Sequence, residues 1–599
     1  MSRNRRGIEK PKDFKGTFSK LLDYLSPYKV KLIIVIIFAI GSTIFSIVGP
    51  KVLGKATTKI FEGLISKISG GAGIDFGYIK RILLILLGLY GLSSLFSYIQ
   101  GFIVSGVAQK VSYNLRKEIS QKINRLPLKY FDSVPYGEVL SRITNDVDTV
   151  SQSLNQSMSQ IITSATTFIG VLIMMLSISW QMTIVALLIL PISAFLIMTV
   201  VKRSQKYFRE QQKFLGQVNG HIEEVYAGQN IVKAFNAEDQ VISEFEDINQ
   251  KLYGSAWKSQ FISGMMMPIM SFVGNLGYVG VSILGGWLTI RNVIEVGDIL
   301  SFIQYIRSFT QPITQVAQIS NVLQSTIASA ERVFEFLEEE EEVEDTKTPI
   351  KLEDIEGRVT FENVKFGYDE DKLIIKNFSQ DVEPGQMVAI VGPTGAGKTT
   401  IVKLLMRFYD LNDGRILLDG IDIRDFARKD LRRNFGMVLQ DTWLFNGTIM
   451  DNIRYGRLDA TDEEVIEAAK MAHAHRFIMT LPDGYNMVIN EEASNISQGQ
   501  KQLLTIARAI LSNPKVLILD EATSSVDTRT ELLIQRAMDN LMKGRTSFVI
   551  AHRLSTIRNA DLILVMKDGD IVEKGTHEEL LAKGGFYYNL YNSQFESVS

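Results

Sequence analysis

The chain has 599 residues, with 64 Lys and Arg against 66 Asp and Glu and a formal net charge of −2. This length allows several domains, and the balanced, scattered charge argues against a nucleic-acid-binding protein. The sequence has no cysteine, which excludes disulfides, thiol catalysis and thiolate metal sites.

Residues 1–28 are basic and polar and contain an amphipathic stripe of Phe18, Leu21, Leu22 and Leu25. Such a stripe is typical of a helix that lies in the membrane interface. The segment shows no cleavable signal pattern, so we expect the membrane spans themselves to direct insertion.

Residues 29–330 contain six apolar runs, each long enough as a helix to cross about 30 Å of hydrocarbon. The runs fall at residues 30–50, 79–105, 157–179, 182–201, 262–287 and 296–316. A buried helix in a soluble core would explain any one of them. Six helices that are apolar all round instead predict a membrane domain.

Lysine and arginine indicate the orientation of these spans. Basic residues crowd the N-terminus and the segments 110–129 and 202–213 of the connections 106–156 and 202–261, which we place in the cytoplasm together with both termini. The outer connections are a short turn at 179–181, a segment at 287–295 and a first loop at 51–78, whose lysines give a mixed signal. The two long inner connections keep apolar residues at helical spacing, so we expect helices that continue beyond the bilayer.

The last span carries a polar face, because Gln304, Arg307, Gln311, Gln315 and Gln318 recur at spacings of three and four. A polar face at membrane depth points toward a water-filled cavity or another helix. Two interpretations stay open. In the first, the transport path is lined by Gln304, Arg307 and Gln311. In the second, the polar face forms hydrogen bonds between helices.

An acidic run, 338–342, continues with Glu344 and Asp345 inside residues 331–349. We interpret residues 331–349 as a solvated linker. Residues 350–599 have the pattern of a soluble α/β domain.

The strongest motif of this domain is a complete P-loop between an apolar strand at 387–391 and a helix at 401–407. Its residues are Gly392, Pro393, Thr394, Gly395, Ala396, Gly397, Lys398 and Thr399, followed by Thr400. Glycines let backbone N–H groups surround phosphate, and a helix N-terminus adds favourable partial charge. We predict that Lys398 contacts the β- and γ-phosphates of ATP and that the Thr399 hydroxyl binds Mg²⁺.

A second apolar run, 516–519, directly precedes Asp520 and Glu521. A buried parallel strand would present these carboxylates at its C-terminal end, where α/β proteins bind ligands. We predict that Asp520 holds Mg²⁺ and that Glu521 polarises the attacking water.

Between these motifs, residues 496–500 read Ile-Ser-Gln-Gly-Gln, which resembles the signature of ATP-binding-cassette (ABC) proteins. The other family elements occur in the family's order. They are the adenine-stacking aromatic residue at Tyr368, the Q-loop at Gln440, the D-loop at Asp527 and the switch histidine at His552. With six spans ahead of one cassette, the whole chain resembles an ABC exporter half-transporter. The resemblance implies a six-helix α-helical membrane domain and an α/β P-loop ATPase domain with an ABC-type helical subdomain.

The resemblance also implies that two cassettes pack head to tail and hold each ATP between one P-loop and the partner's signature. The residues that this chain offers to the partner's site are then Ser497, Gln498, Gly499 and Gln500. Glu521, His552 and Gln440 take catalytic roles, and Gln440 joins Thr399 and Asp520 at Mg²⁺. ATP stabilises the closed pair, and hydrolysis lets it open.

Gln498 departs from the family pattern, which has glycine at this position, whereas the chain's own P-loop site looks intact. This combination resembles the catalytically complete subunit of heterodimeric bacterial multidrug exporters. We therefore favour a heterodimer, with a homodimer as the alternative.

Two inner segments, 137–148 and 226–237, resemble the coupling helices of the family, the second of which docks on the partner's cassette. Glu491 matches the acidic residue that responds to their position.

From these features we expect ATP-driven export of hydrophobic or amphipathic, multidrug-type compounds across the cytoplasmic membrane. The expected partners are a second half-transporter, the lipid bilayer and a small amphipathic substrate, with no nucleic acid. The alternative is a homodimeric lipid flippase of the same fold, and the motifs also allow a nucleotide-gated channel or a sensor. Six spans argue against a soluble ABC ATPase, and the long inner connections argue against an importer.

Overall fold

A computed structural model describes residues 11–351, 354–369, 372–439, 442–490, 495–520, 526–551 and 557–595. In one long helix, several side chains also lie outside the description, among them those of Gln311 and Gln318. The chain divides into two units. A helical unit comprises Met1–Asn124 and Tyr136–Glu339, and an α/β unit comprises Arg125–Pro135 and Glu340–Ser599.

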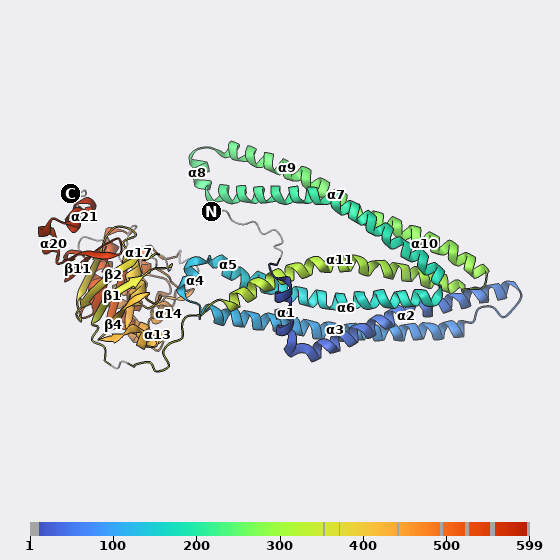
Figure 1. The fold of residues 1–599 in the computed structure, drawn as a ribbon, viewed down its shortest axis with the longest axis horizontal. Helices are drawn as coiled ribbons and strands as arrows, with labels where there is room; N and C mark the ends of the chain where they lie inside the picture. Colours follow the sequence, from blue (N-terminus) through green and yellow to red (C-terminus); the bar gives the residue numbers. More distant parts are fainter. Residues whose placement is uncertain are drawn as a thin grey trace. The chain divides into compact units, whose positions relative to one another are not determined.

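The helical unit is built from long helices that pack along one another (Figure 1). Its elements are α1 (Phe14–Leu25), η1 (Ser26–Tyr28), α2 (Lys29–Ile68), α3 (Phe76–Ile123), α5 (Tyr136–Ser141), η2 (Arg142–Asp146), α6 (Val147–Ile178), α7 (Trp180–Ala227), α8 (Gln229–Ala234), α9 (Glu238–Gly264), α10 (Met266–Ile290) and α11 (Val296–Glu338). Helices α2, α3, α6 and α11 pack together, and α7 packs on α9 and α10.

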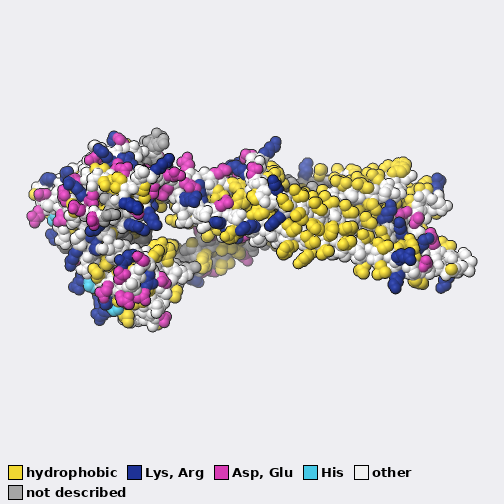
Figure 2. Space-filling view, turned by 90° about the horizontal axis from the view of Figure 1, so that it is seen from below, with side chains coloured by type: hydrophobic (Ala, Val, Ile, Leu, Met, Phe, Trp, Pro, Cys, Tyr) yellow, Lys and Arg dark blue, Asp and Glu magenta, His cyan; other side chains and the backbone are white. Residues whose placement is uncertain are grey.

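The surface of this unit has the character of a membrane domain. Within the described residues, five helical segments are long and apolar enough to cross a membrane. The sixth predicted span, 296–316, lies in α11, where the incompletely described side chains fall. On the face shown in Figure 2, hydrophobic side chains form a broad belt over the helices. Residues such as Leu87 and Phe102 are 70% and 75% exposed, which a soluble surface of contiguous apolar residues rarely tolerates.

The inner connections are helical, as predicted, since α3 and α7 each run for 48 residues. The short outer turn is also confirmed, because Ser179 alone separates α6 from α7. The first outer loop, however, is shorter than the predicted 51–78, since α2 continues to Ile68 and α3 begins at Phe76.

Helix α2 continues past Pro50 and is joined there to α11. The hydroxyls of Ser301 and Tyr305 donate to the carbonyls of Pro50 and Ile47, each at 2.8 Å. These bonds hold α11 against the part of α2 that contains the proline.

The predicted N-terminal stripe of α1 divides between two environments. Leu21 and Leu25 are buried against the rest of the unit, whereas Phe18 and Leu22 are exposed. The exposed half keeps the apolar character that an interfacial helix needs.

The α/β unit contains a parallel sheet and an antiparallel sheet. The first has the order β12-β11-β3-β10-β9-β6, antiparallel only at β12, and the second has the order β2-β1-β4-β5. The strands are β1 (Val359–Phe366), β2 (Ile375–Val382), β3 (Met387–Val391), β4 (Asp413–Leu418), β5 (Ile421–Asp422), β6 (Phe435–Val438), β7 (Gly447–Thr448), β8 (Val488–Ile489), β9 (Val516–Asp520), β10 (Thr546–Ile550), β11 (Leu562–Lys567) and β12 (Asp570–Gly575).

Helices surround these sheets and complete the unit (Figure 1). They are α4 (Leu128–Ser133), α12 (Lys398–Leu405), α13 (Arg428–Arg433), α14 (Ile449–Arg454), α15 (Asp462–Met471), α16 (His475–Ile478), α17 (Gln498–Ser512), α18 (Thr528–Met542), α20 (His577–Lys583) and α21 (Phe586–Phe595). Helices α14 to α17 share a second apolar core with α18 and with strands β6, β9 and β10, and these helices match the expected helical subdomain.

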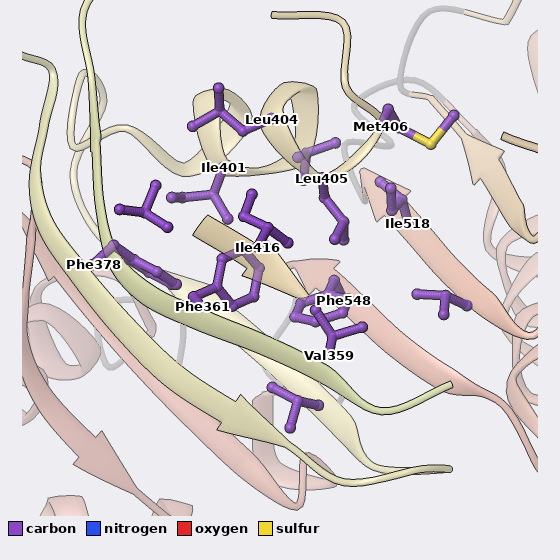
Figure 3. Packing of buried hydrophobic residues seen from close by; sticks show 14 of the residues in the cluster. Val359, Phe361, Phe378, Ile401, Leu404, Leu405, Met406, Ile416, Ile518 and Phe548 are labelled. Atoms are coloured by element: carbon purple, nitrogen blue, oxygen red, sulfur yellow. The ribbon is translucent and has the colours of Figure 1, made fainter. Parts of the chain in front are cut away.

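A cluster of buried hydrophobic side chains holds the two sheets and α12 together, and it includes Phe361, Phe378 and Phe548 (Figure 3). The ring of Phe361 meets those of Phe378 and Phe548 edge to face, with centroids 5.0 and 6.0 Å apart. Burying one such ring contributes about 1.5–3 kcal/mol. Because Ile401 and Leu405 of α12 join this core, the helix that follows the P-loop has a fixed base.

The acidic run is largely exposed, as a solvated linker would be, and its end is also held by ion pairs to α13. Residues up to Glu338 still belong to α11, and the segment after it binds the α/β unit through Arg428 of α13, which is only 8% exposed. Arg428 donates to the carboxylate of Asp345 at 2.8 Å and to the carbonyl of Val343 at 2.5 Å. A buried guanidinium requires such partners, so the acidic residues are retained by ion pairing.

Candidate nucleotide site and its coupling segments

The P-loop follows β3 and turns directly into α12, which begins at Lys398, three residues before the predicted start at 401. Gly395 and Gly397 have φ angles of 83° and 98°, a region that favours glycine. At Gly392 an added Cβ would lie 2.3 Å from the carbonyl oxygen of Met566. The loop therefore requires glycine for backbone conformation and for close packing.

Lys398 folds back over this loop. Its Nζ donates to the carbonyl oxygens of Gly392 at 2.7 Å and Pro393 at 3.1 Å. Burial lowers the pKa of Lys398, and the negative charge of Asp520 opposes that shift. The amine is thus held among neutral carbonyls near one carboxylate, from which it can turn toward a phosphate.

The strands of the parallel sheet place several predicted residues at one edge. Neighbouring strands β3, β10, β9 and β6 run in the same direction, so their C-terminal ends meet there. The P-loop follows β3, and Asp520 is the last residue of β9. Gln440, Glu521 and His552 lie outside the described residues, as does Glu491. Their roles stay predictions.

Tyr368 lies beside the helix that carries the P-loop lysine. Its hydroxyl is 3.5 Å from the hydroxyl of Thr400. Its ring meets those of Phe366 and Tyr409 edge to face, each at 5.1 Å between centroids. The predicted adenine-stacking ring is thus held in place by aromatic neighbours next to the phosphate loop.

The signature forms the start of α17. Ser497 caps the helix by accepting from the Gln500 N–H at 3.3 Å, and the Gln500 side chain accepts from the Ser497 N–H at 2.9 Å. A Cβ on Gly499 would come within 2.4 Å of Thr530 in α18, so glycine permits this close packing. Gln498 donates to the hydroxyl of Thr442 at 3.4 Å.

The D-loop residue Asp527 caps the next helix, α18. Its carboxylate accepts from the Thr530 N–H at 3.0 Å, and this hydrogen bond holds the pKa of Asp527 below its usual value. Gly499 and Asp527 therefore both meet α18 near Thr530, which joins the signature to the D-loop.

A short helix, α4, connects the end of α3 to the nucleotide site. Its Asp132 accepts from Lys403 at 2.8 Å and from the Tyr409 hydroxyl at 2.5 Å. Burial alone would raise the pKa of Asp132, but these two hydrogen bonds outweigh it and hold the pKa below its usual value. Lys403 lies on α12, the same helix that begins with the P-loop residue Lys398. A shift of α12 on nucleotide binding would thus reach α4 directly.

The first predicted coupling segment, 137–148, does not make this contact, and its coupling role stays a prediction. Residues Arg125–Pro135 belong to the α/β unit, whereas 137–148 remains in the helical unit. There Asp146, which is 4% exposed, pairs with Arg332 of α11 through two hydrogen bonds of 2.5 and 3.0 Å. Burial of this pair explains the difference, because it fixes the segment against α11.

The second predicted segment, 226–237, contains α8 and presents apolar side chains outward. Tyr226, Ile231 and Phe235 are 84%, 65% and 77% exposed. A turn between two long helices that exposes three large apolar residues is typical of a protein interface.

The polar face of α11 has more than one environment. Gln304 and Arg307 are exposed in the single chain, and Arg307 borders a cavity in the helical unit. Gln315 accepts a hydrogen bond from Ser164 of α6 at 2.8 Å, as the second interpretation of this face expected. The Gln311 side chain lies outside the described residues.

Sequence reasoning missed Asp132, Lys403 and Tyr409. They are separated by up to 277 residues, and no local pattern links them. The sequence offered two weak signals for this contact. Asp132 is an acidic residue in a basic connection, and Lys403 is a second lysine on the helix that follows the P-loop.

A helical membrane domain joined to a P-loop ATPase domain defines an ATP-driven membrane transport protein. Two family models match the chain, the ABC transporter transmembrane region over residues 32–313 and the ABC transporter over residues 375–524. The chain belongs to the ABC transporter family, as a half-transporter of the exporter type with a membrane domain fused to its ATPase domain.

Similar proteins match over nearly the full length. A fatty acid ABC transporter ATP-binding/permease protein of Mycobacterium bovis is 45% identical, with 97% of this chain and 96% of the relative covered. An ATP-dependent lipid A-core flippase of Syntrophus aciditrophicus is 35% identical, with 98% and 97% covered. The structure of a bacterial Atm1-family ABC exporter with ATP bound superimposes with a TM-score of 0.71 at 29% identity, covering 95% of this chain and 98% of the other.

Proposed function

We propose that the chain is one half of a dimeric exporter that uses ATP to move hydrophobic or amphipathic compounds out across the cytoplasmic membrane. Both termini and the ATPase domain are cytoplasmic in this proposal. The observation that carries it is the contact of Asp132 with Lys403, because it holds α4, the helix that follows α3 in the chain, against the helix of the P-loop. Two relatives named for fatty acids and lipid A support an amphipathic cargo.

The exposed apolar residues of the segment 226–237 support a dimer. Tyr226 and Phe235 require cover, and the cassette of a second subunit is the occupant that the exporter fold offers. The signature at the start of α17 also needs a partner, since in this family it completes the ATP site of the other chain.

Gln498 supports a heterodimer over a homodimer. Its side chain replaces glycine where the partner's phosphate would approach, and it is turned toward Thr442 by a hydrogen bond. We infer that the ATP site built with this signature is the weaker of the two. A homodimeric lipid flippase is the second candidate, which the flippase relative favours.

The residues at the edge of the parallel sheet are of the kind that binds Mg²⁺ together with ATP. Mg²⁺ is usually held by one or two carboxylates together with phosphate oxygens and water. Asp520 supplies one carboxylate and Thr399 one hydroxyl, with Gln440 as a further predicted ligand. Within the described residues there is no larger acidic or histidine cluster that would form a protein-only cage. The ion would neutralise phosphate charge when bound.

Asp132→Asn should weaken the coupling of transport to hydrolysis. The ion pair with Lys403 is partly exposed, so we expect a loss of about 0.7 kcal/mol, or about threefold in substrate-stimulated ATPase activity. ATP binding should change little. Asp539→Asn, an exposed change on α18, is the matched control. Equal stimulation in wild type and Asp132→Asn would remove α4 from the coupling route.

This contact should also have a defined pH dependence. Because the folded pKa of Asp132 is depressed, the contact should be complete above the usual carboxyl pKa of about 4. It should weaken only when the pH falls through the lower folded value. Titrating the stimulated activity of detergent-solubilised protein from neutral to acidic pH tests this.

The decisive experiment reconstitutes the chain in sealed vesicles. Uphill movement of a labelled amphiphile with ATP, and none with ADP, is expected for an exporter. A channel or sensor would show no uphill movement. The ATPase activity of the purified chain alone distinguishes a heterodimer from a homodimer. An inactive lone chain supports the heterodimer, and full activity supports the homodimer.

A further inference from the structure

The helical unit contains a cavity of about 340 Å³ between α7, α10 and α11. Isoleucine and methionine side chains, including Met267 and Met270, form its apolar walls. This volume is at the lower end of the range for small-molecule pockets, which have volumes of about 300–1,000 Å³. The cavity therefore suits a head group with the first part of an attached chain, and methionine walls adapt to chains of different shape.

A buried hydroxyl lines this cavity with no hydrogen-bond partner among the described residues. Ser193 of α7 lines the cavity and is 7% exposed, and its Oγ has no hydrogen-bond partner within the described part of the chain. Other hydroxyls of α7 behave differently. Thr183 and Thr199 donate to the carbonyl four residues earlier at 2.7 and 2.8 Å. An unsatisfied buried hydroxyl is unfavourable, so Ser193 indicates a missing acceptor.

The charge on the described part of the cavity wall is positive. Among the described residues that line it, Arg307 is the single cation and none is acidic, while Asn275 adds an amide. A cation inside a membrane span is costly and marks a functional site by default. Guanidinium groups bind carboxylates and phosphates through paired hydrogen bonds.

We propose that this cavity binds the head group of an amphiphile that carries one anionic group, a carboxylate or a phosphate monoester, on an aliphatic chain. Arg307 pairs with the anion, and Ser193 and Asn275 donate hydrogen bonds to it. The chain lies along the methionine wall. This assignment rests on the proposed export function and adds its substrate class.

Gly274 gives a way to close the cavity. A Cβ built on Gly274 meets no atom within 4 Å, whereas one on the nearby Gly277 would lie 2.0 Å from Ile189. Gly274→Leu should therefore fill the cavity without forcing the helices apart.

The test uses the full-length chain in bilayer nanodiscs of phosphatidylcholine, with a palmitate analogue that carries a photoreactive diazirine on its chain. Palmitate and hexadecyl phosphate should compete for labelling, and methyl palmitate and hexadecyltrimethylammonium should not. Competition by palmitate alone assigns a carboxylate, and competition by both assigns a single anion of either kind. Equal competition by methyl palmitate overturns the proposal.

Variants locate the site. Arg307→Gln should lower labelling about tenfold, and Arg307→Lys should restore part of it, because a cation returns. Gly274→Leu should also lower labelling. Arg291→Gln is the matched control, since Arg291 lies over the Trp287 ring at the end of α10, outside the cavity. Wild-type labelling in Arg307→Gln would overturn the assignment.

Transport in sealed vesicles separates this inference from the proposed function. If ATP drives palmitate and methyl palmitate equally, and Arg307→Gln changes neither, the cavity assignment fails and export stands. If the labelling depends on Arg307 but ATP moves no amphiphile, export fails and the anion site stands.

Discussion

Replacing Glu521 by Gln should nearly abolish ATP turnover while ATP binding is retained. Glu521 follows Asp520, which ends strand β9 at the edge of the sheet that also carries the P-loop. Removing a general base typically lowers the rate by about 10²-fold to 10⁴-fold. The amide keeps the size of the side chain, so the nucleotide should still bind and the paired cassettes should remain closed in the outward-facing state.

Two measurements check this result: steady-state ATPase activity, and the distance between labels on introduced cysteines in the cassettes. The cysteine-free sequence makes such labelling site-specific. Glu578→Gln, an exposed change in α20, should behave as wild type. Turnover near that of the wild type in Glu521→Gln would assign the catalytic carboxylate elsewhere.

The sequence was sufficient for the features that depend on local patterns. The P-loop was recognisable because its glycines, lysine and flanking strand and helix are contiguous, and Gly395 and Gly397 do have the positive φ angles that the motif requires. The long inner helices were recognisable because apolar spacing continues past the spans. The same reasoning explains why α17 begins at the signature, where Ser497 and Gln500 form a capping box.

The features that sequence reasoning missed depend on partners far away in the chain. The ion pair that holds the end of the acidic run was not foreseen, because Arg428 is 83 residues beyond Asp345. The contact of Asp132 with Lys403 was not foreseen either, because the two residues are 271 positions apart. The first outer loop was drawn too long because it was begun where the apolar run ends, whereas α2 continues to Ile68. Contacts between distant segments leave no local pattern in the sequence.

Replacing Lys398 by Ala should strongly weaken ATP binding as well as remove turnover, which separates it from the Glu521 variant. Within the described residues the Lys398 amine donates to the carbonyls of Gly392 and Pro393. Phosphate oxygens would replace these neutral acceptors with charged ones, and a charge-assisted hydrogen bond contributes about 1.5–3 kcal/mol. Loss of about 3 kcal/mol corresponds to a Kd about a hundredfold higher.

Equilibrium binding of a fluorescent ATP analogue measures this change directly, with Lys543→Ala as an exposed control. The glycines hold the loop independently of the lysine, so the thermal midpoint of Lys398→Ala without nucleotide should stay within a few degrees of the wild type. Stabilisation by added ATP should disappear, since a ligand stabilises only the state that binds it. If ATP still raised the midpoint as in the wild type, the lysine would not be the main phosphate contact, and the binding energy would have to come from the loop backbone and the N-terminus of α12.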